Sequence, residues 1–109
     1  MNSYHVFVSP KEGVSSDDLE KQMKLFLDGQ IAENHMRGYR ILKYSDIANF
    51  EGMSDYQIIC DYRNEDELKE GFERMRPDRW KEEPHASMMK MVDGLRVSFS
   101  SDISKVEKK

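Results

Sequence analysis

The sequence predicts an α+β domain in which a four-stranded antiparallel sheet carries helices on one face only. Three observations support this prediction. The chain has 109 residues, which is the size of one domain. Residues 55–62 are rich in β-branched and aromatic side chains and alternate between a fully apolar and a mixed face, as a central strand does. Around them, the order is strand, helix, strand, strand, helix pair, strand.

The first half begins with a strand and a helix. Residues 4–8 alternate and stop before Pro10, because proline has no N–H to donate to a sheet. Ser15 is placed to cap a helix, with Asp18 at the third helical position. Apolar residues then recur at helical spacing: Leu19, Met23, Phe26, Leu27 and Ile31. The helix is expected to end near residue 34. This spacing predicts a helix that covers a sheet.

The middle of the chain holds a second strand, a loop and the central strand. Residues 36–45 read as the second strand. The following residues, 46–54, are too many for a tight hairpin and include two apolar residues that look exposed, Ile47 and Phe50. Such a segment is either a plain connecting loop or a lid or partner contact. The central strand, residues 55–62, comes directly after it.

The second half holds a helix pair and the last strand. Asn64 is placed to cap a helix that Pro77 ends. Pro84, at a first helical position, starts another helix, and Gly94 is expected to be its C-cap. Residues 95–100 then alternate without exception, which predicts the final strand.

This order is the ferredoxin-like βαββαβ arrangement, and its two right-handed crossovers place all helices on one face of the sheet. The opposite face has no cover and carries a half-apolar set: His5, Phe7, Gln57, Ile59, Asp61, Arg96 and Ser98, with Arg40, Leu42 and Tyr44 from the second strand. Two copies packed face to face would enclose a barrel-like cavity. We therefore expect a homodimer, a single ferredoxin-like α+β barrel domain over residues 1–104 and a basic disordered tail at 105–109.

Composition argues against several classes of function. The net charge is −4 with both signs mixed, so no clustered basic surface is expected to bind nucleic acid. No apolar run approaches the length of a membrane span and the start lacks a secretory signal, which predicts no membrane partner and a cytoplasmic location. Cys60, the single cysteine, reads as a buried small hydrophobe. His5, His35 and His85 lack the spacing of a metal site, so we expect no metal.

Short motifs resemble a known group. Pro84-His85-Ala86, leading through Gly94-Leu95 into Val97-Ser98-Phe99, resembles the end of dimeric α+β barrel domains, in which a Pro-His pair opens the last helix. Tyr4-His5-Val6-Phe7 and residues 58–65 resemble the same group. The resemblance covers nearly the whole chain in element order. It implies the superfamily of antibiotic-biosynthesis-type monooxygenases, stress-responsive barrel proteins, haem-degrading enzymes and uncharacterised bacterial members, and it implies no single activity.

Three residues are candidates for catalysis: His85, His5 and Trp80. His85 lies on the apolar side of the last helix, where an imidazole could enter a cavity; a core-edge histidine bonded to backbone is the alternative. Trp80 with His85 resembles the Trp and His of haem-degrading relatives. We expect no cofactor, with haem as the open alternative.

A ligand on the uncovered face would contact Phe7, Ile59 and Leu42, and would be oriented by Arg96 and Asp61 together with His5. The same polar groups could instead fix the register of the dimer. Residues 47–53 or the segment around Trp80 would close the mouth of the cavity. The sequence thus predicts a small-molecule-binding barrel protein; the alternative is a cofactor-independent or haem-using monooxygenase acting on a small aromatic or polyketide-like substrate.

Overall fold

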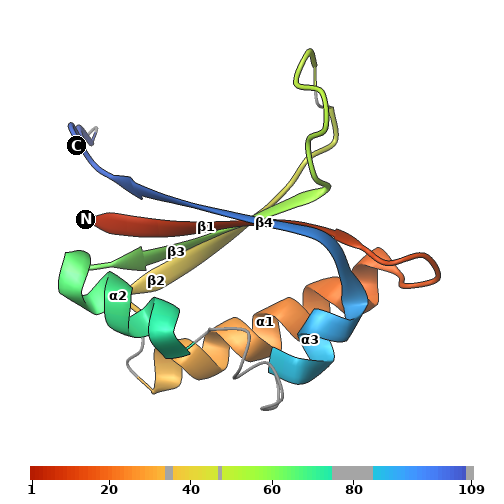
Figure 1. The fold of residues 1–109 in the computed structure, drawn as a ribbon, viewed down its shortest axis with the longest axis horizontal. Helices are drawn as coiled ribbons and strands as arrows, with labels where there is room; N and C mark the ends of the chain where they lie inside the picture. The colour runs from red at the N-terminus through yellow and green to blue at the C-terminus, as the bar shows by residue number, and fades with distance from the viewer. Residues whose placement is uncertain (34–35, 47, 75–84, 108–109) are drawn as a thin grey trace.

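The computed structural model describes residues 1–33, 36–46, 48–74 and 85–107. Its elements, in order, are β1 (Asn2–Pro10), α1 (Ser16–Ala32), β2 (Gly38–Lys43), β3 (Tyr56–Tyr62), α2 (Glu65–Arg74), α3 (His85–Met91) and β4 (Val92–Ser101). The strands form one antiparallel sheet in the order β2-β3-β1-β4. All three helices lie on the same side of this sheet (Figure 1). This confirms the predicted ferredoxin-like fold.

The sheet has two different faces. In β3 every second residue is buried, namely Tyr56, Ile58, Cys60 and Tyr62. The residues between them are only half-buried. Cross-strand pairing extends this pattern, since Val6 of β1 lies opposite both Ile58 and Val97 on the helix side. None of the described helices covers the other side, which we call the open face (Figure 1). Its residues are Ser3, His5, Phe7, Arg40, Leu42, Gln57, Ile59, Asp61, Arg96, Ser98 and Ser100.

The helix starts are capped as the sequence predicted. The Ser15 hydroxyl accepts a hydrogen bond from the backbone N–H of Asp18 at 3.1 Å, which satisfies one of the free donors of the first turn of α1. Asn64 does the same for the N–H of Glu67 at 2.9 Å, and the Glu67 carboxylate accepts from the N–H of Arg63 at 2.9 Å. The stripe of α1 is buried at Leu19, Met23, Phe26 and Leu27.

Gly94 has a different role from the one predicted. The helix α3 ends at Met91 and β4 begins at Val92, so Gly94 lies inside a strand and is not a helix cap. The pairing of β4 with β1 shifts register between Phe7 and Ser9, and Gly94 there adopts a φ of +64°. A glycine tolerates this conformation at a β-bulge without steric cost. Glycine is favoured both at a helix cap and at a β-bulge, so the residue alone does not distinguish the two. This explains the wrong prediction of a helix cap at Gly94.

None of the helices in the described part of the chain is both long and apolar enough to cross a membrane.

Candidate functional site

The open face gathers all five side chains that the sequence proposed as ligand contacts. Phe7 lies opposite Arg96 on one neighbouring strand and opposite Gln57 on the other, with Leu42 beyond Gln57. Ile59 lies opposite His5 in the next row, and Asp61 lies opposite Ser3. Because alternate residues of a strand share a face, the side chains of these rows are on the same side of the sheet.

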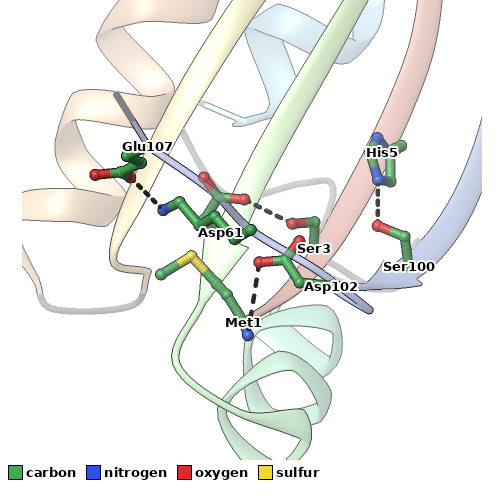
Figure 2. Close-up of polar contacts among 8 residues, drawn as sticks. Met1, Ser3, His5, Asp61, Ser100, Asp102 and Glu107 are labelled. Carbon is green, nitrogen blue, oxygen red and sulfur yellow. Dashed lines mark hydrogen bonds and ion pairs between the residues drawn. The ribbon is translucent and has the colours of Figure 1, made fainter. Parts of the chain in front are cut away.

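A chain of hydrogen bonds crosses the open face from the end of β2 to β4. Tyr44 donates through its hydroxyl to the amide oxygen of Gln57 at 2.5 Å, and the Gln57 amide nitrogen lies 2.9 Å from Nδ1 of His5. His5 Nε2 in turn lies 2.7 Å from the hydroxyl of Ser100 (Figure 2). Since the Gln57 amide nitrogen can only donate, Nδ1 accepts and Nε2 carries the proton, which it donates to Ser100. One histidine is thereby held in one tautomer by strands on both sides.

This arrangement limits what His5 can do chemically. A general base needs a ring nitrogen that can take a proton from a substrate. Here Nδ1 already accepts from Gln57 and Nε2 already donates to Ser100. In this geometry His5 positions its neighbours, and a catalytic role requires a substrate to displace Gln57 or Ser100.

Asp61 and Arg96 have separate partners. The Asp61 carboxylate accepts from the hydroxyl of Ser3 at 2.6 Å (Figure 2). The Arg96 guanidinium donates to the backbone carbonyl of Gly52 at 2.7 Å, which ties the loop between β2 and β3 to the edge strand β4. The two charges therefore do not neutralise each other. Asp61 lies at one end of the open face and Arg96 at the other.

Two cavities lie beside this loop on the open face. One has a volume of about 370 Å³ and its lining is Phe7, Tyr44, Asp46, Phe50, Met53 and Gln57. The other has a volume of about 220 Å³ and its lining is Phe7, Phe50, Gly52, Met53, Ser54, Arg96 and Val97. Phe7 and Arg96 are thus next to a cavity, as the sequence proposed, whereas Ile59, Leu42 and Asp61 lie outside both linings. Ile47 falls outside the described residues.

A larger groove lies on the other side of the sheet, between α2 and β4. Its volume is about 640 Å³ and its lining is Asn2, Glu65, Leu68, Lys69, Phe72, Glu73, Phe99, Ser100 and Ser101. Three rings pack together along it: the centroid of Phe72 lies 5.6 Å from that of Tyr4 and 5.3 Å from that of Phe99. Phe99 is 52% exposed although it points to the helix side. Sequence reasoning missed this groove, because helical periodicity does not encode the distance between a helix and an edge strand.

Tyr4 of β1 and Cys60 of β3, which are cross-strand neighbours in the core, are both neutral near pH 7. Burial, with a smaller contribution from Cys60, raises the pKa of Tyr4 to about 12. Burial, with a smaller contribution from Asp61, raises the pKa of the Cys60 thiol to about 12 as well. A thiol must ionise to act as a nucleophile. Cys60 is therefore a structural residue, as its position in the sequence suggested.

Two of the catalytic candidates cannot be compared with this geometry. Trp80 and the side chain of His85 lie outside the described part of the chain. Among the described side chains, no three of the types His, Cys, Asp and Glu come together as a metal site.

Comparison with known proteins gives matches in structure. No protein-family model matches the chain, and no curated protein sequence matches it. The crystal structure of the Arabidopsis thaliana protein At3g17210 has a TM-score of 0.74 at 16% identity, over 98% of this chain and 100% of that one. A variant of SnoaB, a cofactor-independent oxygenase from Streptomyces nogalater, has a TM-score of 0.69 at 8% identity, over 98% and 97%. A dimeric ferredoxin-like protein of unknown function from Thermobifida fusca has a TM-score of 0.61 at 14% identity, over 92% and 89%. The likeness confirms the fold that the sequence predicted and that its resemblance to dimeric α+β barrel proteins implied.

Proposed function

We propose that this protein is a homodimer that binds a small molecule in the groove between α2 and β4. The observation that carries the proposal is the groove itself. Its volume of about 640 Å³ falls within the range of roughly 300–1,000 Å³ typical of ligand sites. An apolar floor with a few polar groups at the rim is also typical of such sites. Phe72 and Phe99 supply the floor, and Asn2 and Ser101 supply polar groups.

The dimer would form through the open face. Apolar side chains such as Ile59 and Leu42 are half-buried there without cover from the described helices. A second copy would bury them, and the Tyr44 to Ser100 chain of hydrogen bonds would fix its register. The dimeric state of the Thermobifida fusca protein of the same fold supports this. The groove lies on the helix side, so it would stay accessible in the dimer.

Ligand binding can be tested with the neutral fluorophore prodan, whose emission shifts when its naphthalene ring leaves water. We expect binding to the wild-type protein, and binding about tenfold weaker to Phe99→Ser, because the variant removes one of the three packed rings. Phe50→Ser is the matched control, since Phe50 is an exposed phenylalanine that lines the open-face cavities instead. A loss confined to Phe50→Ser would move the site to the open face, where the sequence placed it. Absence of binding by the wild type would contradict the proposal.

A cofactor-independent or haem-using monooxygenase is the second candidate function, supported by the fold shared with SnoaB. In that case His85, His5 and Trp80 are the candidate catalytic residues. A haem titration separates the two branches, since a Soret shift that His85→Ala abolishes would support haem as the cofactor. Oxygen consumption with an aromatic substrate and no added cofactor would support the other branch. If neither signal is observed, the protein binds a small molecule without catalysing an oxygenation. The cytoplasmic location and the absence of nucleic-acid and membrane partners stay predictions from the sequence.

A further inference from the structure

The described residues of the loop that joins β2 to β3, 44–46 and 48–55, stand away from the sheet on the open side (Figure 1). Its base is closed by a hydrogen bond from the N–H of Tyr44 to the carbonyl of Asp55 at 2.9 Å. The N–H of Asp55 also donates to the hydroxyl of Ser9 at 3.1 Å. Arg96 holds the carbonyl of Gly52 at 2.7 Å. The closed base and the two ties to the sheet, at Ser9 and Arg96, make the loop a fixed projection. A lid, by contrast, needs hinges that are free to move.

Phe50 is 62% exposed on this loop. It lines the two open-face cavities together with Phe7 and Met53. Leu25 of α1 is 60% exposed, but it lies on the helix layer, on the other side of the sheet. A single exposed apolar residue is ordinary. The position of Phe50 next to an uncovered, half-apolar face is what distinguishes it.

The open face alone is small for a stable dimer. A sheet of four strands about 4.8 Å apart and roughly seven residues long has a footprint on the order of 400 Å². A standard interface buries about 800 Å² of accessible surface on each partner. Accessible surface is larger than a flat footprint, so the sheet face alone would reach roughly the lower end of the usual range. A second sheet packed on the open face must lie beside the projecting loop, because sheets stack only about 10 Å apart. The loop therefore meets any copy that covers this face.

We infer that the loop at residues 44–55 is a dimerisation arm and that Phe50 packs against a second copy of this chain. The inference rests on the proposed dimer and adds the residue that anchors it. In a two-fold dimer each arm contacts the partner in the same way, so one substitution removes two contacts. Large aromatic side chains seated at the centre of a contact carry a disproportionate share of the binding energy. The arms would add contact area to that of the sheet face.

The test compares two equally exposed apolar residues. Dimer dissociation is measured by sedimentation equilibrium for the wild type, Phe50→Ser and Leu25→Ser. We expect Phe50→Ser to raise the dissociation constant at least tenfold and Leu25→Ser to leave it within about twofold. Phe50→Leu, which keeps an apolar side chain, should fall between them. Circular dichroism checks that each variant is folded.

The outcomes separate the inference from the proposal beneath it. A monomeric wild type would overturn the dimer itself. A dimeric wild type that Phe50→Ser does not weaken would overturn the arm and leave the dimer standing. An unchanged dimer together with weaker prodan binding by Phe50→Ser would assign the loop to a ligand site and likewise overturn the arm.

Discussion

At residue 71 the helix α2 has no room for a side chain. A Cβ added to Gly71 would lie 2.5 Å from Cε1 of Tyr62, a fully buried tyrosine. We therefore expect Gly71→Ala to lower the free energy of unfolding by about 1–3 kcal/mol through overpacking, even though alanine is the better helix former by about 1 kcal/mol. Urea denaturation measures the change.

Gly29 of α1 is the matched control. It is also a helical glycine, but a Cβ there would meet nothing within 4 Å. Gly29→Ala should therefore stabilise the protein by roughly 0.5–1 kcal/mol, the usual gain from replacing a glycine in a helix. If both substitutions shifted the urea midpoint in the same direction, the close contact between Gly71 and Tyr62 would not be the cause.

Two buried groups predict loss of stability at alkaline pH. Burial raises the pKa of Cys60 from 9.0 to about 12 and that of Tyr4 from 10.0 to about 12. Unfolding returns both to their ordinary values, so the unfolded chain releases protons that the folded chain retains. Their stabilising effect is complete below pH 9 and is lost as pH rises toward 12.

The free energy of unfolding, measured by urea denaturation at several pH values, should therefore decline from pH 9 upward. Cys60→Ala removes one of the two groups. Its decline should be shallower than that of the wild type, whatever its stability at neutral pH. If the free energy of unfolding fell with pH equally steeply in the two proteins, Cys60 would not contribute to the loss of stability at alkaline pH.

At the scale of the element, the first turn of α1 depends on its cap. Ser15 satisfies the N–H of Asp18 through its hydroxyl. Ser15→Ala should lower the free energy of unfolding by about 1 kcal/mol. Ser15→Asp, which restores an acceptor at the same position, should recover most of it. Thermal or urea unfolding of the three proteins checks this, and an equal loss in Ser15→Asp would mean that the hydroxyl does not act as a cap.

A helix or strand could be predicted from the sequence where a single local pattern determines it. The alternation of residues 55–62 identified β3, and the stripe from Leu19 to Leu27 identified the buried side of α1. Because strand faces alternate strictly, the open-face set also followed from the sequence once the strand order was assigned. Gly94 was misassigned because a positive φ serves a helix cap and a β-bulge equally well.

Site geometry was less predictable, because it depends on distances between elements. The composition of the open face was evident, but the link from Tyr44 through Gln57 to His5 requires the actual register of three strands. The groove depends on how α2 sits relative to β4, so that Phe72 and Phe99 meet at its floor. No periodicity within one segment carries that information.

At the scale of the molecule, the two faces of the sheet have different roles in this account. The helix side contains the core and the groove that we propose as a ligand site. The open face, on whose side the loop between β2 and β3 projects (Figure 1), is the proposed dimer interface. Ile59 lies near the centre of the open face, so we expect a charge there to disrupt the proposed dimer. Ile59→Lys would place an unpaired charge in the interface, at a cost of several kcal/mol.

We expect Ile59→Lys to be monomeric and folded, because in the monomer Ile59 is only half-buried and points away from the core. Size-exclusion chromatography with circular dichroism checks both parts of this expectation. A folded Ile59→Lys dimer would show that the interface lies elsewhere.

The most direct measurement is the mass of the wild-type protein in solution by light scattering across the micromolar range. One chain has a mass of 12.9 kDa. We expect a species of twice that mass, from two open faces in contact. A single species of 12.9 kDa at every concentration would contradict it, because the open face would then be exposed to water and the loop at residues 44–55 would have no partner.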